Sequence, residues 1–255
     1  MTLKVTYIGH ATTLIQWDGI NILTDPVFSD RILFFKRLKP LNFDLSQLPK
    51  LDCICLSHAH YDHLDLFSYK YIPSDVPIII PEGMTGAINR FVGNPIVEMT
   101  TWSRYTLKEN VKICAIPSRH VGGRLFWPFR YTKCHGYVIS KGVENIYFAG
   151  DTAYQNEFEN LRSLFPIKLA ILPVATNAKN AWVRSKHMNV QDVVRCWKDL
   201  GKPDWIPIHW GTFFKWLNKP EIILAALEEQ ARQDPLLFEK MHLMEPGGLF
   251  EIRPG

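Results

Sequence analysis

The sequence predicts a layered α/β fold, organised as one domain over residues 1–255. Short strand-like runs alternate with helical segments along the chain, which is typical of sheets covered by helices. Neither an internal repeat nor a Gly/Ser-rich or Pro-rich linker divides the sequence. Hydrophobic residues make up 47% and charged residues 21% of the chain, as in ordinary globular domains. No apolar run approaches the roughly 18 residues that a membrane-spanning helix needs.

Strands are predicted first from the alternation of apolar and polar residues near the N-terminus. Leu3–Ile8, Thr12–Trp17 and Ile20–Thr24 show this pattern, and Asp18-Gly19 is a typical hairpin turn between the last two. The segment from Ile32 to Pro49 is predicted to be irregular. Seven later strands are predicted where short apolar runs end at turn residues: Leu51–Leu56, Val76–Ile80, Val111–Ile116, Gly136–Ser140, Asn145–Ala149, Leu169–Pro173 and Asp204–Ile208.

Helices are predicted where apolar residues recur with helical spacing. One of them has clear end signals, because Asn189 is a typical N-cap and Gly201 a typical stop. The predicted helices are Leu64–Tyr71, Glu82–Phe91, Glu157–Leu164, Val190–Leu200 and Pro220–Asp234.

Charge and cysteine content indicate the environment of the protein. The net charge of +4 is too small to argue for nucleic acid as a partner. The N-terminal segment alternates like a strand and lacks the basic and apolar regions of a signal peptide. The five cysteines are irregularly spaced, so reduced thiols and a cytoplasmic location are predicted. Cys53 and Cys55 are two residues apart in a predicted strand and are expected to pack in the core.

The segment Ser57-His58-Ala59-His60-Tyr61-Asp62-His63 carries the strongest chemical signal. It places three imidazoles and one carboxylate in six residues, directly after an apolar strand. Histidine and aspartate are ligands that Zn²⁺ accepts. Packing four such side chains in a core without partners would be costly. The motif therefore predicts a metal site.

Three further polar residues each follow a strand-like run. His120 follows Lys-Ile-Cys-Ala-Ile-Pro-Ser-Arg, Asp151 follows Ile-Tyr-Phe-Ala-Gly, and His209 follows Asp-Trp-Ile-Pro-Ile. Binding sites of open α/β sheets form where strands end. We therefore expect these residues to join the histidine motif.

These motifs resemble the metallo-β-lactamase fold superfamily. H-x-H-x-D-H at 58–63, His120, Asp151 in Phe-Ala-Gly-Asp-Thr and His209 in Ile-His-Trp-Gly carry the resemblance. Segments 9–16 (GHATTLIQ), 21–31 (NILTDPVFSDR), 118–124 (SRHVGGR) and 186–189 (KHMN) resemble one branch more narrowly. That branch contains N-acylphosphatidylethanolamine-hydrolysing phospholipase D and its bacterial relatives. The resemblance implies a four-layer αββα sandwich.

The resemblance also implies a binuclear metal centre. Histidine and carboxylate ligands suit Zn²⁺ best, with Mn²⁺ and Fe²⁺ as alternatives. The resemblance assigns His58, His60 and His120 to one ion, assigns Asp62, His63 and His209 to the other, and makes Asp151 the bridge. Two such cations can lower the pKa of a shared water to about 7, which supplies hydroxide at neutral pH. Asp62, Asp151 and His187 are the predicted catalytic residues.

Other residues are expected around the metals. Asp25 resembles the superfamily residue that supports the motif loop, although an Asx-turn before Pro26 is the alternative. His10 either lines the mouth of the site or packs in a turn. In the related lipases the histidine at the position of His187 lies near the substrate phosphate, so His187 is assigned to phosphate contact or leaving-group protonation.

Three aromatic stretches in probable loops bear on the substrate. They are Ile32–Phe35, Leu125–Phe129 and Phe213–Leu217, and basic residues such as Arg124 lie among them. An apolar groove with a basic rim suits an amphiphilic phosphate and contact with the inner face of a membrane, and Arg124, Trp127 and Phe213 are the predicted substrate contacts. The alternative is that these aromatics only pack beneath loops.

Three functions follow in order of preference. The first is a metal-dependent phosphodiesterase of phospholipase D type that acts on a phospholipid-like or other amphiphilic phosphodiester. The second is a lactonase or carboxyl-ester hydrolase that uses the same site. The third is a metal-binding module without turnover. Nucleic acid is not an expected partner, and the oligomeric state is left open.

Overall fold

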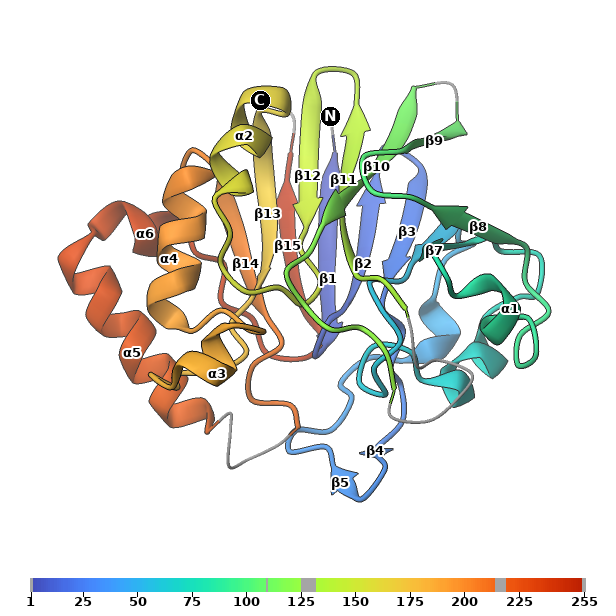
Figure 1. Cartoon of the computed structure of the whole chain (residues 1–255), viewed down its shortest axis with the longest axis horizontal. Coiled ribbons are helices and arrows are strands. Elements are labelled where there is room, and N and C mark those ends of the chain that lie inside the picture. Colours follow the sequence, from blue (N-terminus) through green and yellow to red (C-terminus); the bar gives the residue numbers. More distant parts are fainter. Residues whose placement is uncertain (1, 109, 125–131, 214–218, 254–255) are drawn as a thin grey trace.

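The computed structural model describes residues 2–108, 110–124, 132–213 and 219–253. Two β-sheets face one another, and helices cover the outer face of each sheet (Figure 1). The α/β class and the four-layer αββα arrangement are confirmed. No helix in the described ranges is both long and apolar enough to cross a bilayer.

The first sheet has seven strands and combines an antiparallel with a parallel half. Strands β15, β1, β2 and β3 pair antiparallel, whereas β3, β6, β7 and β8 run parallel. The turn Asp18-Gly19 joins β2 to β3 with φ values of 43° and 83°, as the hairpin signal predicts. In spatial order the strands are β15 (Gly248–Ile252), β1 (Leu3–Gly9), β2 (Thr12–Trp17), β3 (Ile20–Thr24), β6 (Cys53–Cys55), β7 (Ile78–Pro81) and β8 (Ile96–Met99).

The second sheet has six strands. Its members β12, β13 and β14 are parallel, whereas β9, β10, β11 and β12 pair antiparallel. In spatial order they are β14 (Asp204–Ile208), β13 (Ile167–Pro173), β12 (Glu144–Phe148), β11 (His135–Lys141), β10 (Val111–Pro117) and β9 (Arg104–Lys108). A separate two-stranded hairpin, β4 (Arg31–Ile32) with β5 (Phe35–Lys36), projects from the lower end of the sandwich (Figure 1).

The main core lies between the two sheets. Val5 and Ile15 from the first sheet and Ile139 and Ile171 from the second are fully buried in one cluster. Neighbours such as Leu14, Val138 and Leu172 face outward and pack under helices, because side chains alternate between the two faces of a strand. The alternation of side chains thus gives each sheet an apolar inner face, and the inner faces of the two sheets pack against each other.

Helices cover the second sheet on its outer side. They are α2 (Glu157–Leu164), α4 (Val190–Asp199), α5 (Pro220–Gln233) and α6 (Pro235–Lys240). As predicted, Asn189 caps α4, where it forms a capping box with Asp192, and Gly201 follows the helix with φ of 92°. The outer face of the first sheet is covered by η1 (Leu45–Gln47), η2 (Leu66–Tyr71) and α1 (Thr85–Ile88).

Two predicted helices are shorter than expected. The segment predicted as Leu64–Tyr71 is the 3₁₀ helix η2, and the segment predicted as Glu82–Phe91 forms only the single turn α1. Gly83, with φ of 90°, explains why α1 begins only at Thr85, because this backbone conformation is not helical. The prediction also missed β8, β9, β15, α3 (Ala181–Arg184), α6 and the β4–β5 hairpin, which are short or partly exposed.

The topology brings many strand ends to one edge of the molecule. The carboxyl ends of β1, β3 and β6 in the first sheet point to the same edge as those of β10, β12 and β14 in the second (Figure 1). The loops that follow these strands hold the predicted site residues.

Candidate metal centre

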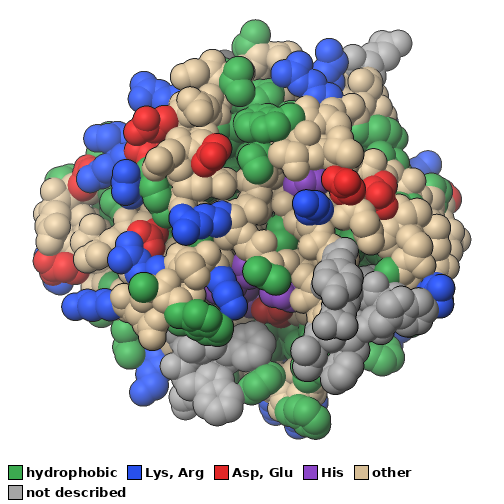
Figure 2. Space-filling view, in the orientation of Figure 1, with side chains coloured by type: hydrophobic (Ala, Val, Ile, Leu, Met, Phe, Trp, Pro, Cys, Tyr) green, Lys and Arg blue, Asp and Glu red, His purple; other side chains and the backbone are tan. Residues whose placement is uncertain are grey.

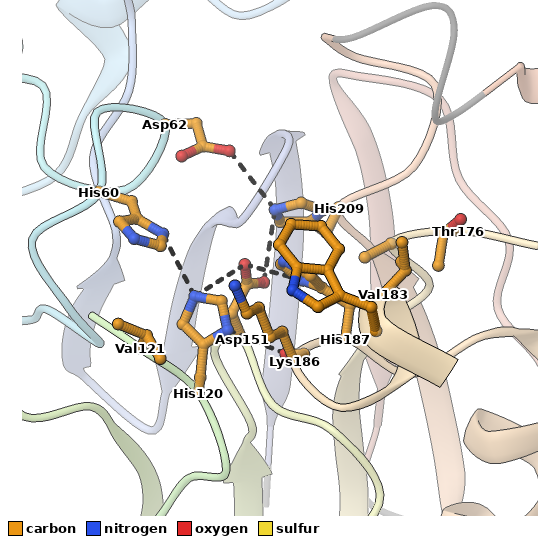
Figure 3. A pocket seen from close by; sticks show the side chains of 12 residues that line it. His60, Asp62, His120, Val121, Asp151, Thr176, Val183, Lys186, His187 and His209 are labelled. Atoms are coloured by element: carbon orange, nitrogen blue, oxygen red, sulfur yellow. Dashed lines mark hydrogen bonds and ion pairs between the residues drawn. The ribbon is translucent and has the colours of Figure 1, made fainter. Parts of the chain in front are cut away.

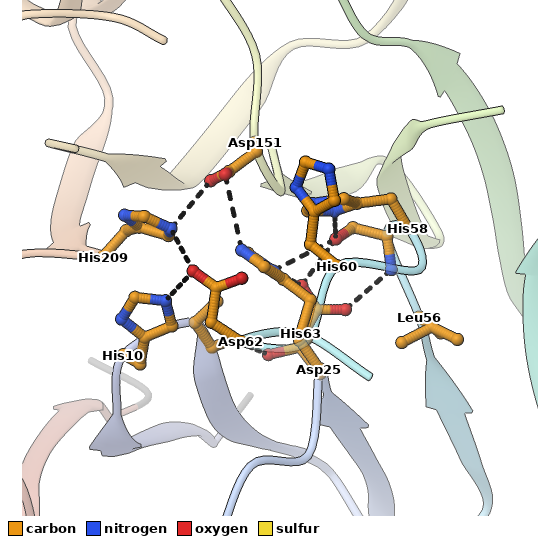
Figure 4. A network of polar contacts seen from close by, with 12 residues as sticks. His10, Asp25, Leu56, His58, His60, Asp62, His63, Asp151 and His209 are labelled. Atoms are coloured by element: carbon orange, nitrogen blue, oxygen red, sulfur yellow. Dashed lines mark hydrogen bonds and ion pairs between the residues drawn. The ribbon is translucent and has the colours of Figure 1, made fainter. Parts of the chain in front are cut away.

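Loops from both sheets supply the ligand-type side chains. The first sheet contributes His10 after β1, Asp25 after β3 and the histidine motif after β6. The second contributes His120 after β10, Asp151 after β12 and His209 after β14. Residues separated by up to about two hundred positions in sequence therefore meet at one edge (Figure 4).

The ligand atoms fall into overlapping groups. Within each group all of these atoms lie within 4.8 Å of one another, which is the spacing that one cation can bridge. The groups are His58, His60 and His120; His10, Asp62, His63 and His209; His58, His63 and Asp151; and His120, Asp151 and His187.

Asp151 lies at the centre of this cluster. Its carboxylate is 3.3 Å from Nε2 of His209 and 3.4 Å from Nε2 of His63. It is also 3.4 Å from Nδ1 of His187 and 3.9 Å from Nε2 of His120. The side chain is almost fully buried, at 2% exposure. Asp151 is thus the residue that connects the two halves of the cluster.

Asp25 supports the histidine motif from below. Its carboxylate accepts hydrogen bonds from the Ser57 N–H at 2.7 Å, the Ser57 hydroxyl at 2.6 Å and Nδ1 of His63 at 2.6 Å (Figure 4). Burial raises the pKa of Asp25, and His63 and Ser57 counteract part of that rise. Because Nδ1 of His63 is bound to Asp25, its Nε2 is the nitrogen directed at Asp151 and the rest of the cluster. Asp25 therefore orients a ligand-type histidine, as the resemblance implies.

Gly150 allows Asp151 to approach the motif loop. Its φ is +57°, and a Cβ at this position would lie 2.5 Å from Cβ of Ser57. A side chain here would displace Ser57, which binds Asp25. Glycine is required at this point for both reasons.

His10 is more central than the sequence indicated. It is fully buried with φ of 59°, its Nε2 is 3.1 Å from Oδ2 of Asp62, and its ring is 4.0 Å from that of His209. Its backbone carbonyl also accepts the His209 N–H at 2.8 Å. Burial lowers the pKa of His10 to about 3, so a neutral ring holds Asp62 and His209 in place. In the sequence, the position of His10 directly after Gly9 at the end of the first strand was only a weak indication that it holds Asp62 and His209.

The electrostatics of the cluster suit a cation. Burial lowers the pKa of His60 to about 4 and that of His58 well below its usual range, so both rings are neutral and keep a lone pair. Burial would raise the pKa of Asp151, but nearby histidines, first among them His209, outweigh it and keep the pKa low. Nε2 of His58 is buried without a hydrogen-bond partner. Nε2 of His120 lies only 3.2 Å from Nδ1 of His60, as in two ligands of one ion. The residues present therefore fit divalent metal ions.

The predicted substrate contacts are placed differently from one another. Arg124 donates from Nε to the carbonyl of Ala59 at 2.6 Å and from a second N–H to the carbonyl of Leu64, so it braces the motif loop. Phe213 does not line a groove, because it is fully buried and packs against His10 with ring centroids 5.2 Å apart. Trp127 lies outside the described residues.

A cavity of about 400 Å³ opens directly onto the cluster. Figure 3 shows His187 beside Asp151 and His120 at this cavity, and Figure 2 shows histidines at the floor of a hollow on the molecular face. Its walls include Val121, Val183, Trp182, which the sequence analysis did not single out, and Lys186, which it noted only as part of segment 186–189. Both come from α3 and the turn after it, an element too short for the sequence to reveal.

Comparison with known proteins agrees with this geometry. Residues 20–210 match the beta-lactamase superfamily domain family. The chain is 32% identical over 221 residues to the mitochondrial N-acyl-phosphatidylethanolamine-hydrolyzing phospholipase D of Saccharomyces cerevisiae, covering 82% of this chain and 47% of that protein. It is 31% identical over 229 residues to N-acyl-phosphatidylethanolamine-hydrolyzing phospholipase D 1 of Caenorhabditis elegans, covering 83% of this chain and 64% of that protein. The chain thus spans about half to two thirds of the length of these relatives.

Solved structures share the fold. Igni18, a metallo hydrolase of the archaeon Ignicoccus hospitalis, superimposes with a TM-score of 0.75 at 19% identity and full coverage of both chains. The chain therefore belongs to the metallo-β-lactamase fold superfamily, in the branch that resembles N-acyl-phosphatidylethanolamine-hydrolyzing phospholipase D.

Proposed function

We propose that the protein is a metal-dependent phosphodiesterase of phospholipase D type, acting on a phospholipid-like or other amphiphilic phosphodiester. One observation carries the proposal: two groups of ligand-type side chains flank Asp151 at the floor of a cavity with apolar walls. The names of the curated relatives point to the same substrate class.

The proposal assigns two divalent ions, zinc by preference, to this cluster. His58, His60 and His120 would hold one ion, and Asp62, His63 and His209 would hold the other, with Asp151 between them. When bound, such ions activate water and neutralise negative charge that develops on a phosphoryl group. The chain's own contribution is to hold the ligands in place, chiefly through Asp25, Ser57 and His10.

His187 is proposed to contact the substrate. It lines the cavity, its Nδ1 lies 3.4 Å from Asp151, and its side chain is 27% exposed. Burial lowers the pKa of His187 to about 4, so the ring is neutral at pH 7. A neutral ring can donate one hydrogen bond to a phosphate oxygen but holds no extra proton for a leaving group. Phosphate contact is therefore favoured over leaving-group protonation.

Metal analysis followed by a substrate panel on the same preparation tests the proposal. We expect about two equivalents of metal per chain and hydrolysis of bis(p-nitrophenyl) phosphate and of a long-chain phosphodiester, both abolished by a chelator and restored by zinc. Hydrolysis of lactones or simple esters alone would replace the phosphodiesterase with a carboxyl-ester hydrolase. Stoichiometric metal without any turnover would instead indicate a metal-binding module.

We also propose that the β4–β5 hairpin rests on an anionic membrane surface. Phe34 at its tip is 91% exposed and Leu33 is 58% exposed, while Arg31 and Lys36 flank them. Apolar tips with basic neighbours suit the interface of an anionic bilayer. Leu33 also lines a second hollow with His60 and Asp62, which would bring the bilayer close to the cluster.

Vesicle sedimentation tests the role of the hairpin. Phe34→Ser should reduce binding to phosphatidylglycerol-containing vesicles several-fold. Val143→Ser is the matched control, because Val143 is 87% exposed at the turn between β11 and β12, at the opposite end of the strands. An equal loss in both variants, or no loss in the first, would remove the hairpin from the proposal.

A further inference from the structure

We infer that Lys186 makes the cavity selective for substrates whose reacting group is negatively charged, with Trp182 holding its ammonium in place. The inference rests on the proposed function and deepens it. It names the class of bond that the site accepts: an anionic diester in preference to a neutral ester. Lys186 is a specificity-determining residue on these grounds.

The backbone of Lys186 is tied directly to the cluster. Its carbonyl oxygen accepts a hydrogen bond from Nδ1 of His120 at 2.9 Å. His120 lies within one of the ligand-type groups, and His187 follows Lys186 in the chain. The position of the Lys186 Cα is thus fixed relative to the cluster, and its side chain lies along the cavity wall (Figure 3).

The ammonium of Lys186 is available to a ligand. Among the described residues it has neither a carboxylate within ion-pair distance nor a hydrogen-bond acceptor, and Nζ lies 4.0 Å from the centre of the Trp182 ring. A cation over an indole face is attracted to it without losing its hydrogen-bonding capacity. Trp182 lies at the start of α3, where its backbone N–H donates a hydrogen bond to Oδ1 of Asn180 at 2.8 Å.

Two arginine side chains that could also attract an anion donate hydrogen bonds to backbone carbonyls instead. Arg124 donates to the backbone carbonyls of Ala59 and Leu64, and Arg119 donates to the carbonyl of Tyr154 at 3.4 Å. Of the described residues that line the 400 Å³ cavity, Lys186 is the one lysine or arginine. Any selection for negative charge beyond the metal cluster therefore depends on it.

The rest of the cavity defines the substrate further. Val121, Ala175 and Val183 form apolar walls beside the ammonium. This combination suits a phosphodiester, which carries a single negative charge on its non-bridging oxygens and two substituents that can be apolar. A neutral ester could contact the same apolar walls but would form no ionic interaction with the ammonium of Lys186.

Substitution of the side chain tests the inference, because the carbonyl that binds His120 is retained in every variant. With metal-loaded protein, Lys186→Met should lower kcat/KM for bis(p-nitrophenyl) phosphate about tenfold to a hundredfold, the range for a lost hydrogen bond between charged groups. The kcat/KM for p-nitrophenyl acetate should change less than about threefold, well below that range. Lys186→Arg should retain most of the phosphodiester activity, and Trp182→Ala should cause a smaller loss that Trp182→Phe avoids.

The matched control is Lys179→Met, which removes an exposed lysine shortly before α3. It should leave both activities unchanged. Calorimetric binding of diethyl phosphate to the metal-loaded proteins adds a readout that does not depend on turnover. The Kd should rise in Lys186→Met by the same factor as kcat/KM falls, with unchanged metal content.

The outcomes separate this inference from the proposed function. Equal losses on the charged and neutral substrates, or an unchanged Kd for diethyl phosphate, would overturn the role of Lys186. If the wild type hydrolyses only neutral esters, the phosphodiesterase is wrong. The calorimetric comparison still decides the inference in that case, since a raised Kd supports an anion-selecting lysine and an unchanged Kd excludes it.

Discussion

Replacing Asp25 with asparagine tests whether the carboxylate of Asp25 orients His63 for metal binding, because the substitution changes the hydrogen bonds of the side chain and leaves its size almost unchanged. Asparagine keeps the shape and one carbonyl oxygen, which can still accept a hydrogen bond from Ser57. Its amide group, however, donates, and it faces Nδ1 of His63, which donates to Asp25 at 2.6 Å in the native protein. Two donors cannot face each other, so we expect His63 to carry its proton on Nε2 instead. The nitrogen directed at the cluster then has no lone pair.

The size of the effect follows from this change of tautomer. Loss of a partner that orients a metal-bound histidine costs about tenfold to a hundredfold in metal affinity, which corresponds to about 1.4–2.8 kcal/mol at about 1.4 kcal/mol per factor of ten. The cost should fall on the ion held by Asp62, His63 and His209. The group of His58, His60 and His120 should keep its affinity within about threefold, because such a support acts on the ligand that it orients.

A competition titration with a chromophoric chelator resolves the two affinities. Circular dichroism of the same samples reports whether the fold is intact. Asp75→Asn is the matched control, since Asp75 is exposed and belongs to none of the ligand-type groups. If Asp25→Asn binds two equivalents of zinc as tightly as this control, Asp25 does not orient His63 and the reasoning fails.

Three further predictions concern the cluster and its surroundings. Asp151→Asn should abolish turnover while retaining the fold by circular dichroism, and rates close to wild type would contradict its central role. Trp127→Ala should slow hydrolysis of long-chain substrates more than that of short soluble ones, and equal effects would make Trp127 a packing residue. The metal-free protein should lose stability as pH falls from the ordinary histidine pKa of 6.5 towards 4, as measured by urea unfolding in a chelator. In this range the histidines of the unfolded state bind protons, whereas the buried rings of the folded state stay neutral. The free energy of unfolding therefore falls by up to about 1.4 kcal/mol per ring and pH unit. A free energy of unfolding that does not change with pH would show that these rings are not neutral in the folded protein. The rings concerned, with pKa values lowered by burial, are His10 (about 3), His60 (about 4) and His187 (about 4).

The sheets and the gathering of the ligand-type residues could be predicted because their signals are local. Strand β3 alternates apolar and polar residues, and His120, Asp151 and His209 each follow a recognisable strand. Strand ends meet at one edge of a layered fold, so the convergence of these residues followed from their positions alone.

Other features were hidden because they depend on the tertiary structure. Strand β8 and helix α3 have only four residues each, so neither has a clear period. Strand β9 does alternate polar and apolar residues from Arg104 to Lys108, and this signal was overlooked. The sequence could not show that Phe213 turns inward to back His10, since burial of an aromatic loop residue depends on what covers it. Trp182 was missed and Lys186 was given no role of its own for a similar reason, because the importance of both side chains depends on what they face in the folded chain.

The cluster draws its side chains from both sheets of the sandwich. Asp62 and His63 extend from the first sheet, while His120, Asp151 and His209 extend from the second. An ion shared between them would act as a cross-link between the two sheets, at one end of the interface where they pack together. Loading the protein with metal should therefore slow amide hydrogen exchange in β1 and β13 together, although neither strand contributes a residue of the ligand set from within its own bounds.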